Sequence, residues 1–350
     1  MSSSNIISPT DRVLVTGSNG FIGAKVVEIL LEYGFRNIRC FVRPSSKLDR
    51  LKAILEKYGA GKTAEIVPGD LLSRDDCRRA AEGVSVIYHL AAGMEKSFAG
   101  AFMNSALATR NLMDAFLESG KVKRFVNVSS FAVYSNLKLD RGALLDETCP
   151  LEDAPQERCD AYCFGKLKQE ELVRQYGETK KLPYAILRPG AVFGPGKRAL
   201  SGRVGIDTFG FFIHLGGGNQ LPLTFVDNCA EAIVLAGLKP GVDGEIFNVV
   251  DDDLLTSAEF LSAYKQKVKP FFSVPVPFFV AHAMCCLWED FSKRRHGQLP
   301  AVFNRRRAAS EWKGNRFSNQ KLHERLGWKP RVPMAQAMTA FLSQYDQPAN

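Results

Sequence analysis

The sequence predicts an α/β protein in which a doubly wound parallel sheet is followed by a smaller, mainly helical C-terminal domain. In the first half of the chain, six short apolar runs alternate with amphipathic segments. This alternation is typical of parallel sheets with helices on both faces. After Pro189 the pattern ends, residues 194–222 are rich in glycine, and prolines recur beyond Thr256. The 350 residues are 45% hydrophobic and 24% charged, which excludes a disordered chain.

The apolar runs predict strands and the segments between them predict helices. The expected strands are Val13–Val15, Ile38–Val42, Ala64–Val67, Val84–His89, Arg124–Val128 and Tyr184–Leu187. The expected helices include Ile22–Tyr33, Asp75–Glu82, Ala99–Ser119 and Tyr162–Lys180. A further helix, Asn228–Leu238, precedes a strand at Glu245–Val250 that is expected to rejoin the sheet. We therefore expect a sheet domain of residues 1–189 and 225–251. Residues 190–224 and 252–350 are expected to form a second domain over the sheet edge where ligands of such folds bind.

The net charge of +9 points to nucleic acid, a membrane surface or an anionic small molecule as partner. Residues 290–331 hold 12 Lys and Arg against 3 Asp and Glu, so this one segment accounts for the whole imbalance. No aromatic stacking pattern accompanies its basic residues, which argues against nucleic acid. A small-molecule substrate is the expected partner.

The cysteines and the N-terminus indicate a cytoplasmic protein with reduced thiols. None of the eight cysteines belongs to a CxxC pair or stands at zinc-ligand spacing from a histidine, so no metal site is predicted. The polar start, MSSSNIISPT, is not a secretory signal. The cysteines are Cys40, Cys77, Cys149, Cys159, Cys163, Cys229, Cys285 and Cys286.

The longest apolar stretch, Phe271–Trp288, contains two prolines and a histidine and falls short of the roughly 20 apolar residues of a spanning helix. Basic residues flank it on both sides: Lys265, Lys267 and Lys269, and then Lys293, Arg294 and Arg295. Two interpretations stay open. The stretch either closes an apolar substrate pocket or docks the protein peripherally on anionic lipid.

The first strand runs directly into TGSNGFIG, Thr16–Gly23, and a helix follows. Glycines at this spacing allow a tight turn and close approach of a pyrophosphate, while the helix N-terminus offers amide donors. This context predicts a Rossmann-type dinucleotide site. The residues assigned to the cofactor are Gly17, Asn19, Gly20, Phe21, Ile22, Gly23, Arg43, Asp70, Leu71, Leu90, Ala91, Ala92, Tyr162, Lys166 and Pro189.

The second strand indicates which nicotinamide cofactor is used. An acidic residue at its end would bind the ribose 2′-hydroxyl of NAD. The sequence instead has Arg43, and a guanidinium suits the 2′-phosphate of NADP. NADP(H) is therefore favoured, with NAD(H) as the alternative.

Four Tyr-x-x-x-Lys patterns occur, at Tyr58, Tyr134, Tyr162 and Tyr176, but only Tyr162 and Lys166 open a long predicted helix. Residues four apart share a helix face, so both side chains are expected to point at one substrate. A nearby ammonium is expected to lower the phenol pKa from about 10. With a serine from the fifth strand end, the pair suits hydride transfer between a secondary alcohol or ketone and nicotinamide.

In combination these motifs resemble the extended short-chain dehydrogenase/reductases, the NAD(P)-dependent epimerase/dehydratase superfamily, from Val13 to about Ala337. Five segments are similar to sequence motifs of that family: TGSNGFIG, GDL, HLAA, SSFAVY and YCFGK. The resemblance implies that Ser130 is the catalytic serine and that Asn104 supports the active-site helix and a proton relay. It also implies a homodimer formed through Ala99–Ser119 and Tyr162–Lys180. Gly165 departs from the Ser or Thr that many members carry before the lysine.

Three functions remain open at this point. Three features resemble 3β-hydroxysteroid dehydrogenases and dihydroflavonol-type reductases. They are VRP after the second strand, LTFVDN without a preceding Arg-Asp pair, and the Pro-rich apolar stretch. A nucleotide-sugar epimerase or dehydratase with bound NAD is the first alternative, and a diphosphate clamp would then come from basic residues of the second domain. A non-catalytic NAD(P)-binding regulatory protein is the second alternative. The candidate substrate residues are Arg198, Arg203 and Arg305, with Arg306, Arg307 and Arg316 nearby.

Overall fold

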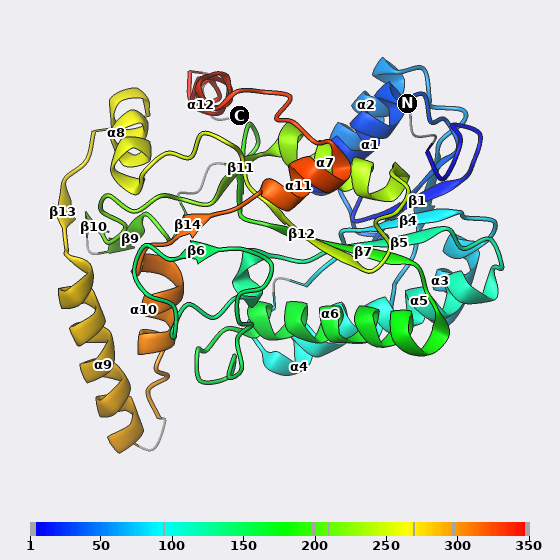
Figure 1. Ribbon diagram of the computed structural model, residues 1–350. Coiled ribbons are helices and arrows are strands. Elements are labelled where there is room, and N and C mark those ends of the chain that lie inside the picture. Colours follow the sequence, from blue (N-terminus) through cyan, green and yellow to red (C-terminus); the bar gives the residue numbers. More distant parts are fainter. Residues whose placement is uncertain are drawn as a thin grey trace.

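The computed structural model describes residues 5–93, 95–197, 201–208, 210–268, 270–295 and 298–346. Its centre is a seven-stranded sheet in the order β12-β7-β5-β4-β1-β2-β3, in which all neighbouring strands are parallel (Figure 1). The strands are β1 (Val13–Thr16), β2 (Ile38–Val42), β3 (Glu65–Pro68), β4 (Val86–His89), β5 (Arg124–Val128), β7 (Tyr184–Pro189) and β12 (Glu245–Val249).

The strand order reverses between β1 and β4. From β1 the chain proceeds outward to β2 and β3, then returns to place β4 on the other side of β1. The connections that leave β1 and β4 therefore diverge at the carboxyl ends of these strands, where dinucleotides bind in such folds. All seven strands that the sequence predicts are present, and the fold class is confirmed.

Helices cover both faces of the sheet because alternate strand residues point to opposite sides. On one face, Val13 and Val15 pack with α1 (Phe21–Glu32) and α7 (Val226–Leu238), and α2 (Asp49–Lys57) lies beside α1 (Figure 1). On the other face, Leu14 packs with α3 (Arg74–Ala81) and α5 (Ala108–Glu118), and α6 (Ala161–Lys180) lies next to α5.

Several short elements connect to this frame. The helical ones are α4 (Phe98–Ala101), the π-helix η1 (Phe102–Leu107) and the 3-10 turn η2 (Phe131–Val133). Three small sheets contain β8 (Ala191–Phe193) with β11 (Leu223–Phe225), β6 (Leu144–Leu145) with β14 (Arg316–Phe317), and β9 (Gly205–Thr208), β10 (Phe211–His214) and β13 (Ser273–Pro275). These small strands were not predicted from the sequence.

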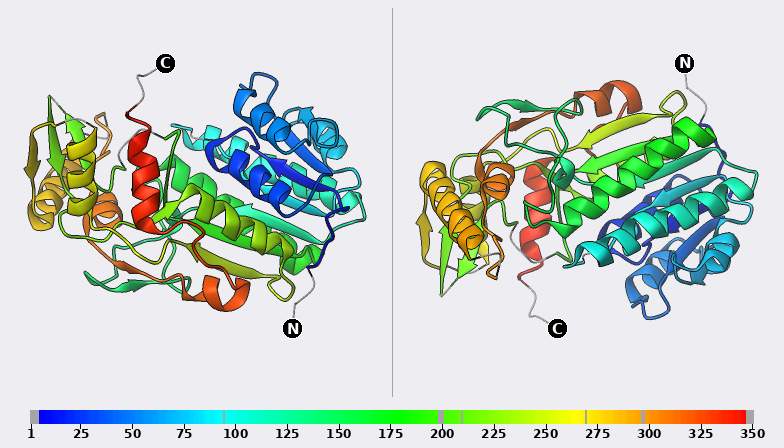
Figure 2. Two further views of the ribbon diagram at one scale, coloured as in Figure 1. Left: turned by 90° about the horizontal axis from the view of Figure 1, so that it is seen from above. Right: turned by 90° about the horizontal axis from the view of Figure 1, so that it is seen from below.

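The later helices are α8 (Ser257–Lys267), α9 (Phe278–Arg294), α10 (Arg305–Trp312), α11 (Gln320–Leu326) and α12 (Met334–Ser343). Figure 2 shows α8, α9 and the β9–β10–β13 sheet gathered at one end of the molecule. In contrast, Leu322 of α11 and Phe341 of α12 belong to the same apolar cluster as β1 and α7. The last part of the chain thus returns to the large sheet.

The described ranges were searched for two further kinds of feature, a membrane span and a metal-binding cluster. Within them, no helix has the length and apolar character needed to cross a bilayer. The same ranges contain no cluster of three or more metal-ligating side chains. The eight cysteines are all free.

Candidate active site

The turn between β1 and α1 has the geometry of a phosphate cradle. Gly17 adopts a positive φ of 67°, which only glycine takes up without strain. A Cβ on Gly23 would collide with the Gly17 carbonyl oxygen, so the helix can approach the turn only with glycine at this position. Gly20 caps α1 without a side-chain hydrogen bond, which leaves the first amides of the helix free for an anion. The residues present fit a pyrophosphate.

The other predicted cofactor residues lie at the neighbouring strand ends. Arg43 follows β2 and is exposed. Asp70 follows β3, and its carboxylate accepts a hydrogen bond of 2.9 Å from the Leu72 amide. Leu90, Ala91 and Ala92 follow β4, and Pro189 ends β7. A Cβ on Gly17 would touch the Ala91 backbone, so the first and fourth strand ends meet closely. The predicted residues therefore gather along one edge of the sheet.

Tyr162 and Ser130 face each other across the end of β5. Ser130 caps η2, where its hydroxyl oxygen accepts a hydrogen bond of 3.1 Å from the Ala132 amide. Burial raises the pKa of Tyr162, and a hydrogen bond with Ser130 acts in the opposite direction. The lowering of the Tyr162 pKa by Lys166 that we expected is wrong for this structure, because the lysine ammonium bonds elsewhere.

Lys166 is buried beneath the site and held by two acceptors. Its Nζ donates to the Val128 carbonyl oxygen at 2.6 Å and to Gln169 Oε1 at 2.9 Å. Burial lowers the pKa of Lys166 to about 8, although the Glu170 carboxylate favours the charged form. The Gln169 amide then donates to Thr109 Oγ1 at 2.8 Å. Lys166 is thus the first member of a buried hydrogen-bonded chain.

The chain continues from Thr109 to the nucleotide turn through His89. The Thr109 hydroxyl donates to the Ser105 carbonyl at 2.6 Å, so its oxygen is an acceptor for His89 Nε2 at 2.8 Å. His89 Nδ1 therefore accepts from the Thr16 hydroxyl at 2.8 Å. Thr16 Oγ1 in turn accepts a hydrogen bond of 3.2 Å from the Ala91 amide. Burial and the charge of Lys166 lower the pKa of His89 to about 3, which keeps the imidazole neutral.

We expect Gln169→Leu to lower the pKa of Lys166 by about one to two units, because a hydrogen bond to a charged group is worth about 1.5–3 kcal/mol. The measurement is a ¹³Cε NMR titration of labelled lysines, with the Lys166 signal assigned by Lys166→Met. Gln175→Leu, at an exposed position on the same helix, is the control and should leave the titration unchanged. An unaltered Lys166 pKa in Gln169→Leu would contradict this role.

Asn104 lies in η1, the π-helical turn between α4 and α5. Its amide donates to Glu95 Oε1 at 2.8 Å, an acceptor that the sequence did not predict. The unusual Gly165 is explained by packing at the same place. A Cβ there would lie 3.0 Å from Ser105 Oγ and 3.2 Å from the Ala101 carbonyl oxygen. Glycine therefore lets α6 approach η1 closely.

Arg158 fixes the loop that leads to Tyr162, and sequence reasoning missed it. Its guanidinium donates to the Ala132 and Tyr134 carbonyls at 2.8 and 3.1 Å and pairs with Asp160 at 2.7 Å. Asp160 in turn caps α6 by accepting the Cys163 amide at 2.8 Å. These bonds tie the start of α6 to the segment that carries Ser130.

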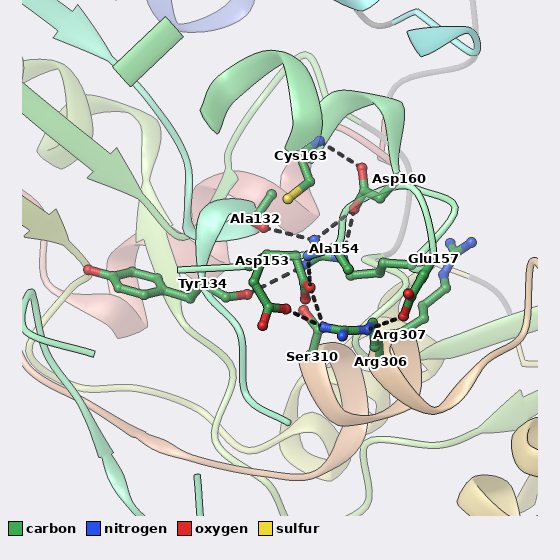
Figure 3. Close-up of polar contacts among 12 residues, drawn as sticks. Ala132, Tyr134, Asp153, Ala154, Glu157, Asp160, Cys163, Arg306, Arg307 and Ser310 are labelled. Carbon is green, nitrogen blue, oxygen red and sulfur yellow. Dashed lines mark hydrogen bonds and ion pairs between the residues drawn. The ribbon is translucent and has the colours of Figure 1, made fainter. Parts of the chain in front are cut away.

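The candidate substrate arginines take part in internal contacts. Arg306 lies among three carboxylates and contacts Glu152 and Asp153 at 2.6 Å (Figure 3). Arg305 pairs with Glu289 of α9 at 2.9 Å. The remaining contacts are Arg306 with Glu157 at 3.1 Å, Arg307 with Glu311 at 3.0 Å, Arg316 with the Gly142 carbonyl at 3.1 Å and Arg203 with the Ser310 carbonyl at 2.8 Å. Arg198 lies outside the described residues, and the assignment of these residues to substrate stays a prediction.

Comparisons with known proteins agree with this architecture. Residues 13–249 match the model of the "NAD dependent epimerase/dehydratase family". A 3β-hydroxysteroid-dehydrogenase/decarboxylase, isoform 2, of Arabidopsis thaliana is 25% identical over 95% of this chain, which spans only 61% of that protein. A 3-β-hydroxysteroid dehydrogenase of Mycolicibacterium neoaurum is 27% identical over 95% of this chain and 91% of its own length.

Solved structures show the same fold. The crystal structure of gox2253 is 26% identical, with a TM-score of 0.77 over 97% of this chain and 98% of that chain. A UDP-glucose 4-epimerase of Thermus thermophilus, solved with NAD, is 21% identical, with a TM-score of 0.69 over 97% of this chain and 100% of its own. From the family match and the nucleotide cradle together, we conclude that this chain belongs to the NAD-dependent epimerase/dehydratase family, the extended short-chain dehydrogenase/reductase enzymes.

Proposed function

We propose that this enzyme is an NADP(H)-dependent oxidoreductase that interconverts a ketone and a secondary alcohol on an apolar, steroid-like substrate. The observation that carries the proposal is the pairing of Tyr162 with Ser130 at the edge of the sheet that holds the nucleotide cradle. Two hydroxyls side by side can both bond one carbonyl oxygen. The cofactor, when bound, supplies or accepts the hydride.

The protonation states support reduction of a ketone near neutral pH. Because burial raises the pKa of Tyr162, the phenol keeps its proton at pH 7 and is a proton donor to the carbonyl oxygen. Ser130 orients that oxygen by a second hydrogen bond. Lys166, with its pKa lowered to about 8, remains largely protonated at pH 7 and supplies positive charge below the site.

The pairing of the arginines favours an apolar substrate over a nucleotide sugar. A diphosphate clamp needs guanidinium groups that are free to bind phosphate. Arg305, Arg306 and Arg307 instead bond carboxylates of this protein, and a diphosphate would have to displace them. Several 3β-hydroxysteroid dehydrogenases among the relatives support the same substrate class. The presence of Ser130, Tyr162 and Lys166 together argues against a purely regulatory protein.

The direct test is a screen of ketosteroid-like ketones and nucleotide sugars with NADPH and NADH, followed by nicotinamide absorbance and product analysis. The proposal expects NADPH consumption with a ketone. Turnover of a nucleotide sugar without net change in the nicotinamide would overturn it.

The cofactor preference is tested by Arg43→Ala. We expect this change to weaken NADPH binding about 10- to 100-fold and NADH binding little, because only NADPH carries the 2′-phosphate. Dissociation constants from nicotinamide fluorescence titrations measure both. Lys52→Ala, at an exposed position of α2, is the control. Equal weakening of NADPH and NADH would refute a phosphate contact by Arg43.

A further inference from the structure

Helix α9 presents a broad apolar face to solvent. Phe279, Leu287 and Met284 are 73%, 71% and 62% exposed, and Phe291 is 41% exposed. Trp288 extends the same side at 38%. Successive steps of four residues, from 279 through 287 to 291, place these side chains along one side of the helix. Figures 1 and 2 show α9 along the outside of the molecule, at the end farthest from α3.

The opposite side of α9 packs against the rest of the protein. Ala281 and Cys285 are buried and pack in a cluster with Ala308 and Trp312 of α10. The small residues thus face the protein together with Phe278, which packs against the same cluster, whereas Phe279, Met284 and Leu287 face outward. This arrangement does not fit the expectation that α9 closes an apolar substrate pocket, because most of its bulky side chains point away from the protein.

Positive charge is concentrated at the C-terminal end of this face. Arg294 and Arg295 are exposed, and among the described residues neither forms an ion pair within 4 Å. The Arg295 guanidinium lies 5.4 Å from the centre of the Phe291 ring, so charge and apolar surface are adjacent. The acidic groups of the helix are neutralised, since Glu289 bonds Lys293 at 2.7 Å and Asp290 bonds Arg305 at 3.1 Å.

The other predicted basic flank forms contacts within this chain, one of them an ion pair at the surface. Lys265 donates to Ser273 Oγ at 3.0 Å, and Lys267 pairs with Asp346 at 2.8 Å. Lys269 lies outside the described residues. The free positive charge of the face therefore comes from Arg294 and Arg295, because Lys293 pairs with Glu289.

We propose that the outer face of α9 docks on an anionic lipid surface, with the helix lying in the plane of the interface. A bilayer with anionic lipids offers both the apolar interior and the negative charge that this face complements. A second copy of this chain would bring the same basic residues and no matching acidic patch from α9. The helix has 17 residues and does not meet the length of a membrane span, which agrees with surface docking. The proposal is independent of the substrate.

The test is co-sedimentation of the purified full chain with lipid vesicles at roughly physiological salt. Neutral vesicles contain phosphatidylcholine alone, and anionic vesicles contain phosphatidylcholine with about 30% phosphatidylserine. We expect binding to the anionic vesicles and at least tenfold weaker binding to neutral ones. Trp288 gives an independent signal, because Trp312 and Trp328 are buried at 2% and 1% exposure. Its emission should shift to shorter wavelength on docking, and Trp288→Phe should remove that shift.

Two surface variants separate the apolar from the electrostatic contribution. Phe279→Asp with Leu287→Asp, and separately Arg294→Glu with Arg295→Glu, should each weaken binding to anionic vesicles tenfold or more. The matched controls are Leu144→Asp, at a 47% exposed position of β6, and Lys121→Glu with Lys123→Glu before β5. Wild-type protein that stays in the supernatant overturns the proposal. A second result would also overturn it. If light scattering shows that the wild type is a dimer, that Phe279→Asp with Leu287→Asp is a monomer, and the wild type does not bind vesicles, the face is a dimer interface.

Discussion

Replacing Tyr162 by phenylalanine is expected to lower kcat for ketone reduction by about 10²- to 10⁴-fold, the usual contribution of a positioned general acid. The aromatic ring remains in place beside Ser130, so the fold should not change. Because Tyr162 is also assigned to the cofactor, the NADPH titration reports any loss of nucleotide binding separately from the loss of kcat. Initial rates with an accepted ketone, together with an NADPH titration, provide the measurement.

The chain contains its own control for this substitution. Tyr176 belongs to a second Tyr-x-x-x-Lys pattern on the same helix, and its hydroxyl donates to Asp114 at 2.8 Å. Tyr176→Phe therefore removes a phenol from α6 without touching the strand end at Ser130. We expect nearly full activity from it. A Tyr162→Phe variant that keeps more than a tenth of the activity would remove Tyr162 from the chemistry.

The largest effect on stability is expected from the buried pair of Arg188 and Glu170. Both side chains are at most 1% exposed, and they form two parallel bonds of 2.9 and 2.7 Å that fasten α6 to β7. Arg188 also donates to the Tyr134 hydroxyl at 2.9 Å. Arg188→Met leaves a buried carboxylate without its partner, which costs about 3–5 kcal/mol. Thermal unfolding should show a midpoint lowered by roughly 5 °C or more.

Two further variants give this prediction its controls. Lys168 and Glu171 form an ion pair of 2.6 Å on the same helix but are 41% and 62% exposed, so Lys168→Met should cost less than about 1 kcal/mol. Adding Glu170→Leu to Arg188→Met removes the orphaned charge and should recover much of the stability. If Arg188→Met is as stable as the wild type, the pair does not fasten α6.

The sequence predicted the sheet well because parallel strands buried on both faces are continuous apolar runs. Val13–Thr16 is fully buried, and its β-branched apolar residues directly before a glycine-rich turn are typical of such a strand. By contrast, the bounds of α2 were not predicted, because only three of its residues, Leu51, Ile54 and Leu55, are buried in a short charged segment. The two- and three-residue strands around β8 and β14 depend on partners distant in sequence, which no local pattern reveals.

The candidate site likewise contains residues that a local motif predicts and residues that only the folded structure brings together. The glycine turn, Ser130, Tyr162 and Lys166 were found because each belongs to a short motif at a strand or helix end. The members of the buried chain, His89, Thr109 and Gln169, were missed, since they come from three separate elements. One signal was available: Gln169 lies three residues after Lys166, where a helix facing a sheet normally carries an apolar side chain. The direction of the Tyr162 pKa shift could not be predicted, because burial depends on the whole fold.

Net hydride transfer between a nicotinamide and a ketone is tested most directly with NADPH that carries deuterium at both C4 positions, because an enzyme transfers only one of the two. The enzyme is incubated with the ketone that it accepts, and the product alcohol is analysed by mass spectrometry. We expect one deuterium at the carbinol carbon and one NADP⁺ formed for each alcohol. Product without deuterium, or an isomerised nucleotide sugar with no net NADP⁺, would contradict it.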